Sequence, residues 1–127
     1  MSYEVRWTAE ALGSRVEVEC LEIIEILDWY DGPMITLSKV DGVLHYSHAV
    51  DTGNGWAVYI YVPVGEGVAE QIRHNQIALR DVLTAPEQAL VITFDWNGLP
   101  NRRIVRSVST ADLPPEWLPQ PGACLAP

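Results

Sequence analysis

The stretch that decides the fold runs from residue 34 to residue 64 and reads MITLSKVDGVLHYSHAVDTGNGWAVYIYVPV. Asp41-Gly42 separates two runs of apolar and β-branched residues. An Asp-Gly pair in this position favours a tight hairpin, because glycine accepts a positive φ at no steric cost. The polar loop at 51–55 then leads into WAVYIYVPV, whose aromatic and β-branched content suits a pleated sheet. We therefore predict a three-stranded antiparallel meander.

Two further strand-like runs lie closer to the C-terminal end, ALVITFD at 89–95 and RRIVRSVS at 102–109. Asn97-Gly98 lies between them and is typical of a hairpin tip. Residues 66–84, between the meander and this hairpin, form the best helical candidate. Their apolar positions do not follow one heptad, so we predict two short helices that meet near Asn75. Pro86 ends the second helix, because a proline disfavours helical geometry at the residue before it.

The segment from Ser14 to Tyr30 has two interpretations. Its β-branched residues favour a strand, bulged near Leu21, whereas acidic residues spaced three apart could also follow the polar face of a helix. The turn-forming sequence Asp-Gly-Pro at 31–33 leads straight into the meander, which favours the strand. The sum is an α+β fold with a mainly antiparallel sheet of about six strands, comprising the meander and a C-terminal hairpin, and one or two short helices.

Length and composition predict one domain over residues 1–127. Residues 1–13 are expected to form a flexible N-terminal segment, and residues 113–127, which hold five of the nine prolines, a C-terminal strap. No apolar run approaches the roughly 18 residues of a membrane span, and the N-terminal residues lack the apolar region of a secretory signal. The two cysteines, Cys20 and Cys124, form no C-x-x-C pair. We expect a cytoplasmic protein with reduced thiols and no membrane contact.

The chain carries 17 acidic residues against 8 basic ones, a formal net charge of −9. Direct binding to nucleic acid is disfavoured, because affinity for phosphates depends mainly on Lys and Arg. Six acids and no base lie between Glu17 and Asp31. This run could be the solvated face of an edge strand, or it could mimic phosphates and enter a basic groove. The one basic cluster, Arg102, Arg103 and Arg106, could hold an acidic partner or pair with the protein's own carboxylates.

Asp51-Thr52-Gly53 resembles the catalytic triplet of retroviral-type aspartic proteases, and the likeness covers residues 49–53. In that family two copies of the chain bring two carboxylates together to activate water, so the resemblance makes Asp51 a candidate catalytic residue. Asn54 departs from the family pattern, which usually has Ala or Ser there, and no later hydrophobic-hydrophobic-Gly segment completes it. The same residues also suit an ordinary hairpin loop.

The histidines do not predict a metal site. His45 and His48 are three residues apart on one expected strand, so their side chains should lie on opposite faces. A zinc site needs three or four converging ligands, and His74 is expected on a helix far from this pair. We predict no metal and no cofactor.

Large aromatic side chains are frequent for so small a domain. Tyr59 and Tyr61 share one face of their strand, and aromatic residues are favoured at the centres of interfaces. We predict a contact surface made of this aromatic face, the acidic run and the anchored tail. Its members are Glu17, Glu19, Glu22, Glu25, Asp28, Trp29, Tyr30, Asp31, Tyr59, Tyr61 and Trp117.

Three motifs together resemble a family of small bacterial proteins with no established activity. They are DWYDGP at 28–33, IALRDVL at 77–83 and LPPEWLPQPG at 113–122, and the likeness extends from about Leu21 onward. The resemblance implies a bacterial or phage origin and brings no cofactor or catalytic residue.

The sequence thus favours a non-enzymatic interaction or regulatory module that works through a protein partner or as a homo-oligomer. One alternative is an inhibitor or immunity protein of bacterial defence conflict that blocks a basic nucleic-acid channel. Another is a dimeric aspartic protease that uses Asp51.

Overall fold

The computed structural model describes residues 12–30, 32–95 and 102–125. Within them the chain forms a single sheet of seven strands in the order β1-β7-β6-β5-β4-β3-β2, in which all neighbouring strands are antiparallel. The strands are β1 (Ser14–Val16), β2 (Leu21–Trp29), β3 (Pro33–Val40), β4 (Val43–Gly53), β5 (Trp56–Pro63), β6 (Gln88–Asp95) and β7 (Arg102–Ser109). The α+β class with a mainly antiparallel sheet is confirmed, and the described residues form seven strands rather than about six.

The predicted meander is present as β3, β4 and β5. Asp41 and Gly42 have φ values of 48° and 83°, so both central residues of the β3–β4 turn are left-handed, as a two-residue hairpin with the sheet's own twist requires. At the next connection the expected loop is shorter than predicted. Residues 51–53 belong to β4 and pair with residues 56–58 of β5. Strands β6 and β7 form the expected second antiparallel pair; the predicted tip, Asn97-Gly98, lies outside the described residues.

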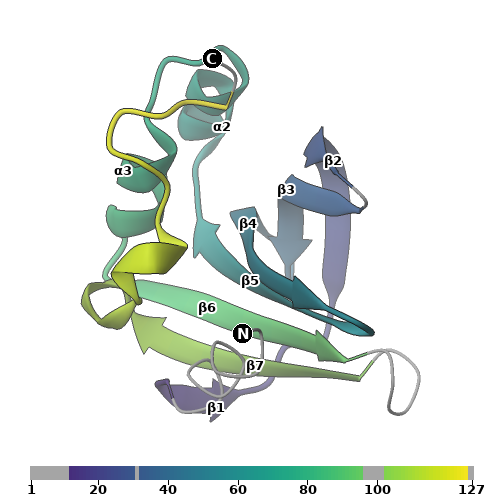
Figure 1. The fold of residues 1–127 in the computed structure, drawn as a ribbon. Helices are drawn as coiled ribbons and strands as arrows, with labels where there is room; N and C mark the ends of the chain where they lie inside the picture. Colours follow the sequence, from purple (N-terminus) through teal and green to yellow (C-terminus); the bar gives the residue numbers. More distant parts are fainter. Residues whose placement is uncertain (1–11, 31, 96–101, 126–127) are drawn as a thin grey trace.

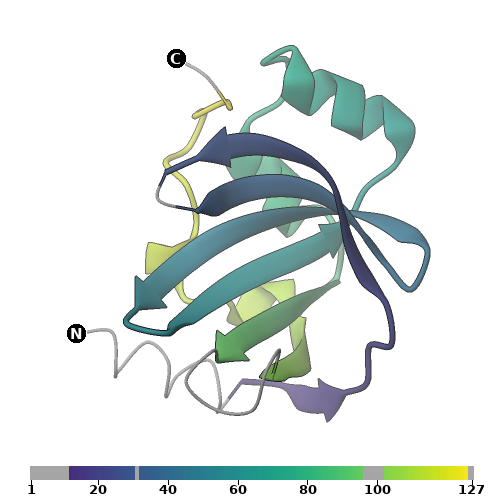
Figure 2. The same cartoon turned by 90° about the vertical axis from the view of Figure 1, so that its right-hand side faces the viewer.

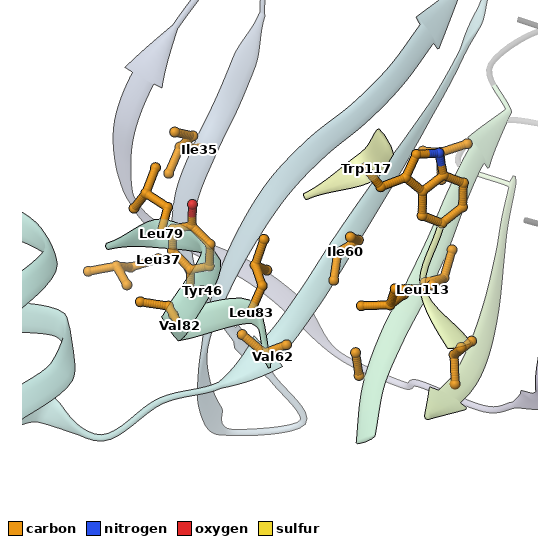
Figure 3. Close-up of a cluster of buried hydrophobic side chains, with 14 of the residues drawn as sticks. Ile35, Leu37, Tyr46, Ile60, Val62, Leu79, Val82, Leu83, Leu113 and Trp117 are labelled. Carbon is orange, nitrogen blue, oxygen red and sulfur yellow. The ribbon is translucent and has the colours of Figure 1, made fainter. Parts of the chain in front are cut away.

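The helical region consists of two short helices, as predicted. These are α2 (Glu66–Arg73) and α3 (Leu79–Thr84), and Asn75 between them has a φ of 58°. Both helices and the C-terminal segment lie against one face of the sheet, called the helix face below (Figure 1). Trp117 and Leu113 from the C-terminal segment are buried there against side chains of α3 and β5 (Figure 3). Neither helix is long and apolar enough to cross a membrane, and no other helix in the described part of the chain is.

Strand β5 is the centre of the core, because seven of its eight residues are buried. Val58, Ile60 and Val62 belong to the cluster on the helix face, whereas Tyr59 and Tyr61 belong to a second cluster on the opposite face. Side chains alternate between the two faces of a strand, so a strand that is apolar at every position must be covered on both sides.

The segment that was predicted as one bulged strand is two strands at opposite edges of the sheet. β1 pairs with β7 at one edge, and β2 pairs with β3 at the other. Residues 17–20 connect them, so the chain runs from one edge strand to the other (Figure 2). Val16, Val18 and Leu21 pack against the second cluster on the way. A single strand was the wrong prediction, because the local pattern does not show that the strand changes partner.

The connection at 17–20 is fixed by two side chains from distant parts of the chain. The Asp41 carboxylate accepts hydrogen bonds from the backbone N–H groups of Glu19 and Cys20, at 3.0 and 2.7 Å. Arg103 of β7 donates to the carbonyl oxygens of Val18 and Glu19, at 3.0 and 3.3 Å. The same aspartate therefore shapes the β3–β4 turn and holds the connection.

This double role predicts that Asp41→Ala lowers the free energy of unfolding by about 1 to 2 kcal/mol, because the substitution removes an ionised acceptor and places alanine at a positive φ. Asp41→Asn should cost less, since asparagine keeps an oxygen acceptor and tolerates that backbone conformation. Urea unfolding of both variants measures the difference. Asp112→Ala, at another exposed aspartate, is the control. Equal losses for the two Asp41 variants would show that the side-chain oxygen does not hold the connection.

Candidate interaction surface

The acidic run is organised by two bulges in β2. In the first bulge Ile23 lies opposite Ser38 and Glu25 opposite Leu37, so Ile24 has no partner of its own on β3. In the second, Ile26 lies opposite Thr36 and Asp28 opposite Ile35, so Leu27 is the extra residue. In a bulge two residues of one strand oppose a single residue of its neighbour. A regular strand would send residues three apart to opposite faces, whereas one extra residue in each interval returns them to the same face.

The three acids of β2, Glu22, Glu25 and Asp28, consequently all lie on the helix face. They stand opposite Lys39, Leu37 and Ile35, and directly paired residues of antiparallel strands share a face. Glu25 accepts a hydrogen bond from Nε of Arg73 at 3.0 Å, which ties β2 to α2. Arg73 also pairs with Glu70 on its own helix. The acids are therefore a row of regularly spaced negative charges, and Glu25 is also a structural contact.

The opposite side of β2 is apolar and open. Ile23 and Ile26 share the face of the second cluster, yet about half of each side chain is exposed. Among the described residues the large hydrophobic side chains that are exposed number six: Ile23 (50%), Ile24 (47%), Ile26 (44%), Trp29 (64%), Tyr30 (78%) and Val43 (54%). Five of these six belong to β2 or follow it directly. We call the five, together with Glu22, Glu25 and Asp28, the β2 surface.

The structure separates the predicted contact residues into two groups. Trp29 and Tyr30 are exposed beside the acids of β2, and Glu17 and Glu19 are exposed on the connection from β1. Tyr59, Tyr61 and Trp117 are buried, with 9%, 4% and 5% exposure. The aromatic sheet face is therefore part of the core and not an accessible contact face, because the second cluster covers the tyrosines and the helix-face cluster encloses Trp117. Asp31 lies outside the described residues.

Sequence reasoning missed the three isoleucines as surface residues. Their β-branched side chains indicate a strand but not which strand is at the edge. The signal that could have found them is the spacing of the acids, E-x-x-E-x-x-D from Glu22 to Asp28. Acids at that spacing share one face of a strand only if a bulge lies in each interval, and bulges are typical of sheet edges.

The basic cluster has mainly a structural role. Arg103 holds the connection at 17–20, and Arg106 Nη1 lies 3.4 Å from the carbonyl oxygen of Leu12. Both contacts are to backbone carbonyls rather than to the protein's own carboxylates. The side chain of Arg102 lies outside the described residues.

The two strand histidines face opposite sides, as their spacing predicts. His45 is buried on the face of the second cluster, where Nδ1 is 2.8 Å from the carbonyl oxygen of Val43. His48 lies on the helix face, and its Nδ1 is 2.8 Å from the hydroxyl of Tyr46. Burial raises the pKa of Tyr46, so this phenol stays protonated. Within the described residues no group of three or more His, Cys, Asp and Glu side chains is placed to hold a metal ion.

A cluster of hydroxyl groups lies beside Ile23 and Ile26 on the same face of the sheet. Thr36 is hydrogen-bonded to Ser38 at 2.7 Å and also to Ser47, and all three are buried. Tyr61 hydrogen-bonds to Ser47 as well, while burial raises the pKa of Tyr61 to about 12. These hydroxyl groups satisfy one another's hydrogen-bonding capacity on the face of the second cluster, an arrangement that stabilises buried polar groups.

Asp51 lies near the end of β4, where it follows a bulge and pairs with Val58. Its Oδ1 accepts a hydrogen bond from the N–H of Thr52 at 2.9 Å, and Oδ2 is buried without a hydrogen bond. Burial raises the pKa of this carboxyl. The triplet at 51–53 is therefore part of the β4–β5 hairpin. Cys20 and Cys124 are both free thiols.

Comparison of the chain with protein-family models, with curated proteins and with solved structures finds no match.

The two histidines of β4 predict how stability depends on pH. Burial lowers the pKa of both His45 and His48 below the ordinary value, although the Asp28 carboxylate opposes this effect at His48. The unfolded chain then binds more protons than the folded one as pH falls through about 6.5, so the free energy of unfolding should decrease from about pH 7.5 to about pH 5.5. Denaturant unfolding at several pH values measures the slope, and His45→Gln and His48→Gln should each reduce it. A double variant with the wild-type slope would contradict this assignment.

Proposed function

We propose that this chain is a non-enzymatic module that binds a protein partner through the β2 surface. The observation that carries the proposal is the concentration of exposed apolar side chains in one edge strand. Scattered single hydrophobics are common on protein surfaces, but five large exposed ones within residues 23–30 are a local concentration of the kind that marks interaction sites.

The composition of the β2 surface supports the same function. Trp29 and Tyr30 are of the residue types that are enriched among the side chains contributing most to binding. The neighbouring carboxylates would form a charged rim, which influences the choice of partner and the rate of association more than the affinity. Edge strands usually avoid exposed apolar side chains because these promote unwanted pairing, so their retention on β2 fits a binding role.

The proposal predicts that a partner captured from the native host depends on β2. The double variant Ile23→Ser/Ile26→Ser should lower recovery of that partner by about tenfold or more, since it removes apolar contact area at the centre of the surface. Affinity capture followed by mass spectrometry measures the loss. Val43→Ser is the matched control, because Val43 is equally exposed but lies outside β2. A partner recovered equally by the double variant would refute the proposed surface.

The row of carboxylates favours a second candidate, an inhibitor that occupies a basic nucleic-acid channel. Glu22, Glu25 and Asp28 stand opposite every second residue of β3, so they present charges at a regular interval along one face. Regular negative charge is what a nucleic-acid backbone offers to a basic groove.

For the inhibitor the expected result is competition. Duplex DNA should displace the chain from its captured partner, and the complex should weaken steeply as salt is raised from about 50 to about 200 mM. Competition binding with labelled chain measures both effects, with an equal concentration of a neutral polymer as the control. A complex that resists DNA would exclude this candidate and leave the interaction module intact.

A further inference from the structure

We infer that the β2 surface accepts an extended, cationic segment of a partner protein in which basic and apolar side chains alternate. This inference rests on the proposed function and specifies the chemistry of the partner. It follows from three properties of β2: its place in the sheet, the separation of its two faces, and its charge.

The first property is position. β2 is the last strand in the sheet order, and β3 is its neighbour on one side only, so within the described part of the chain its outer edge has no strand beside it. A peptide in extended conformation can add to such an edge and continue the sheet, which is a recurring mode of peptide recognition.

The second property is the division of side chains between the two faces. Glu22, Glu25 and Asp28 lie on the helix face, whereas Ile23 and Ile26 lie on the opposite face. A strand added to this edge places alternate side chains on the two faces, and each would adjoin the β2 residues of that face. The favourable sequence therefore alternates, with Lys or Arg beside the acids and apolar residues beside the isoleucines.

The third property is charge, which separates a cationic partner from a second copy of the chain. Directly paired residues share a face, so self-pairing of β2 would bring the acids of two copies together on one face. The stretch 17–30 holds five acids and no base to relieve that repulsion. Of the nearby bases, Lys39 lies opposite Glu22 on β3, and Arg73 is engaged by Glu25 and Glu70. The remaining excess of negative charge favours a basic segment.

The bulges at Ile24 and Leu27 determine how much backbone pairing and how much side-chain contact contribute to the binding of an added segment. An extra residue interrupts the regular ladder of backbone groups and increases the local twist, so backbone pairing alone would hold an added strand only weakly at this edge. Affinity for an added segment would then come mainly from apolar contact with the isoleucines and from the carboxylates. This weakens self-association and keeps the edge selective for complementary charge.

The test uses the full chain and the synthetic peptide acetyl-KVKVKVK-amide, with binding measured by isothermal titration and mapped by amide chemical shifts. Two peptides are controls: acetyl-KKKKVVV-amide, which has the same composition without alternation, and acetyl-EVEVEVE-amide, which has the opposite charge. We expect the alternating basic peptide to bind at least about tenfold more tightly than either control, with shifts confined to β2 and its neighbours.

Two substitutions test the faces separately. Glu22→Lys should weaken binding by about tenfold through like-charge repulsion, and Ile26→Ser should weaken it through lost apolar contact. Glu87→Lys, at an exposed acid distant from β2 in the sheet, should leave it unchanged. Shift mapping on the wild-type chain keeps the test decisive if a variant fails to fold.

The outcomes separate this inference from the function on which it rests. Equal binding of the two lysine peptides would reduce the effect to nonspecific charge and overturn the inference. A dimer that forms through β2, seen by sedimentation, would replace the cationic partner with a second copy. If no peptide binds while partner capture still depends on Ile23 and Ile26, the cationic segment is wrong and the interaction module stands.

Discussion

The structure depends on a strand that must be covered on both faces. β5 is apolar along its length, and seven of its eight residues are buried. One cover comes from α2, α3 and the C-terminal segment, which contributes the buried Trp117. The other comes from the curled sheet itself and from the chain that runs between its two edge strands, with Val16, Val18 and Leu21 turned inward. A sheet that is apolar on both faces can exclude water only when both covers are in place.

The chain that crosses the face of the second cluster explains why the two edge strands differ. β1 and β2 are consecutive in sequence but lie at opposite edges, and the connection at 17–20 is held by Asp41 and Arg103. β1 contributes three residues and an apolar contact to the core. β2 is longer and carries two bulges, and it packs Leu21 against the second cluster and Leu27 against the cluster on the helix face. The remaining isoleucines extend beyond the second cluster, so the same path that closes the core leaves an apolar strand at the surface.

The sequence predicted the elements whose signals are local. Asp41-Gly42 identified the first hairpin, because two left-handed residues are needed there, and the break near Asn75 separated the helices correctly. The opposite orientation of His45 and His48 followed from strand geometry alone. The candidate surface was predicted only in part: Trp29, Tyr30 and four of the acids (Glu17, Glu19, Glu22 and Asp28) are exposed and Glu25 is half-buried, whereas Tyr59, Tyr61 and Trp117 belong to the core. An aromatic pattern has the same appearance in a core and in an interface, so burial had to come from the fold.

By itself the sequence determined the meander, the α+β class and the concentration of negative charge near the N-terminal end. These follow from turn chemistry, from side-chain periodicity and from composition, which act over a few residues or over the whole chain. Only the tertiary structure decided that residues 14–29 divide between two edges, that bulges place the three acids of β2 on one face, and that the isoleucines beside them remain exposed. Those features depend on which strands become neighbours, and pairing between distant segments is settled by the packing of the whole sheet.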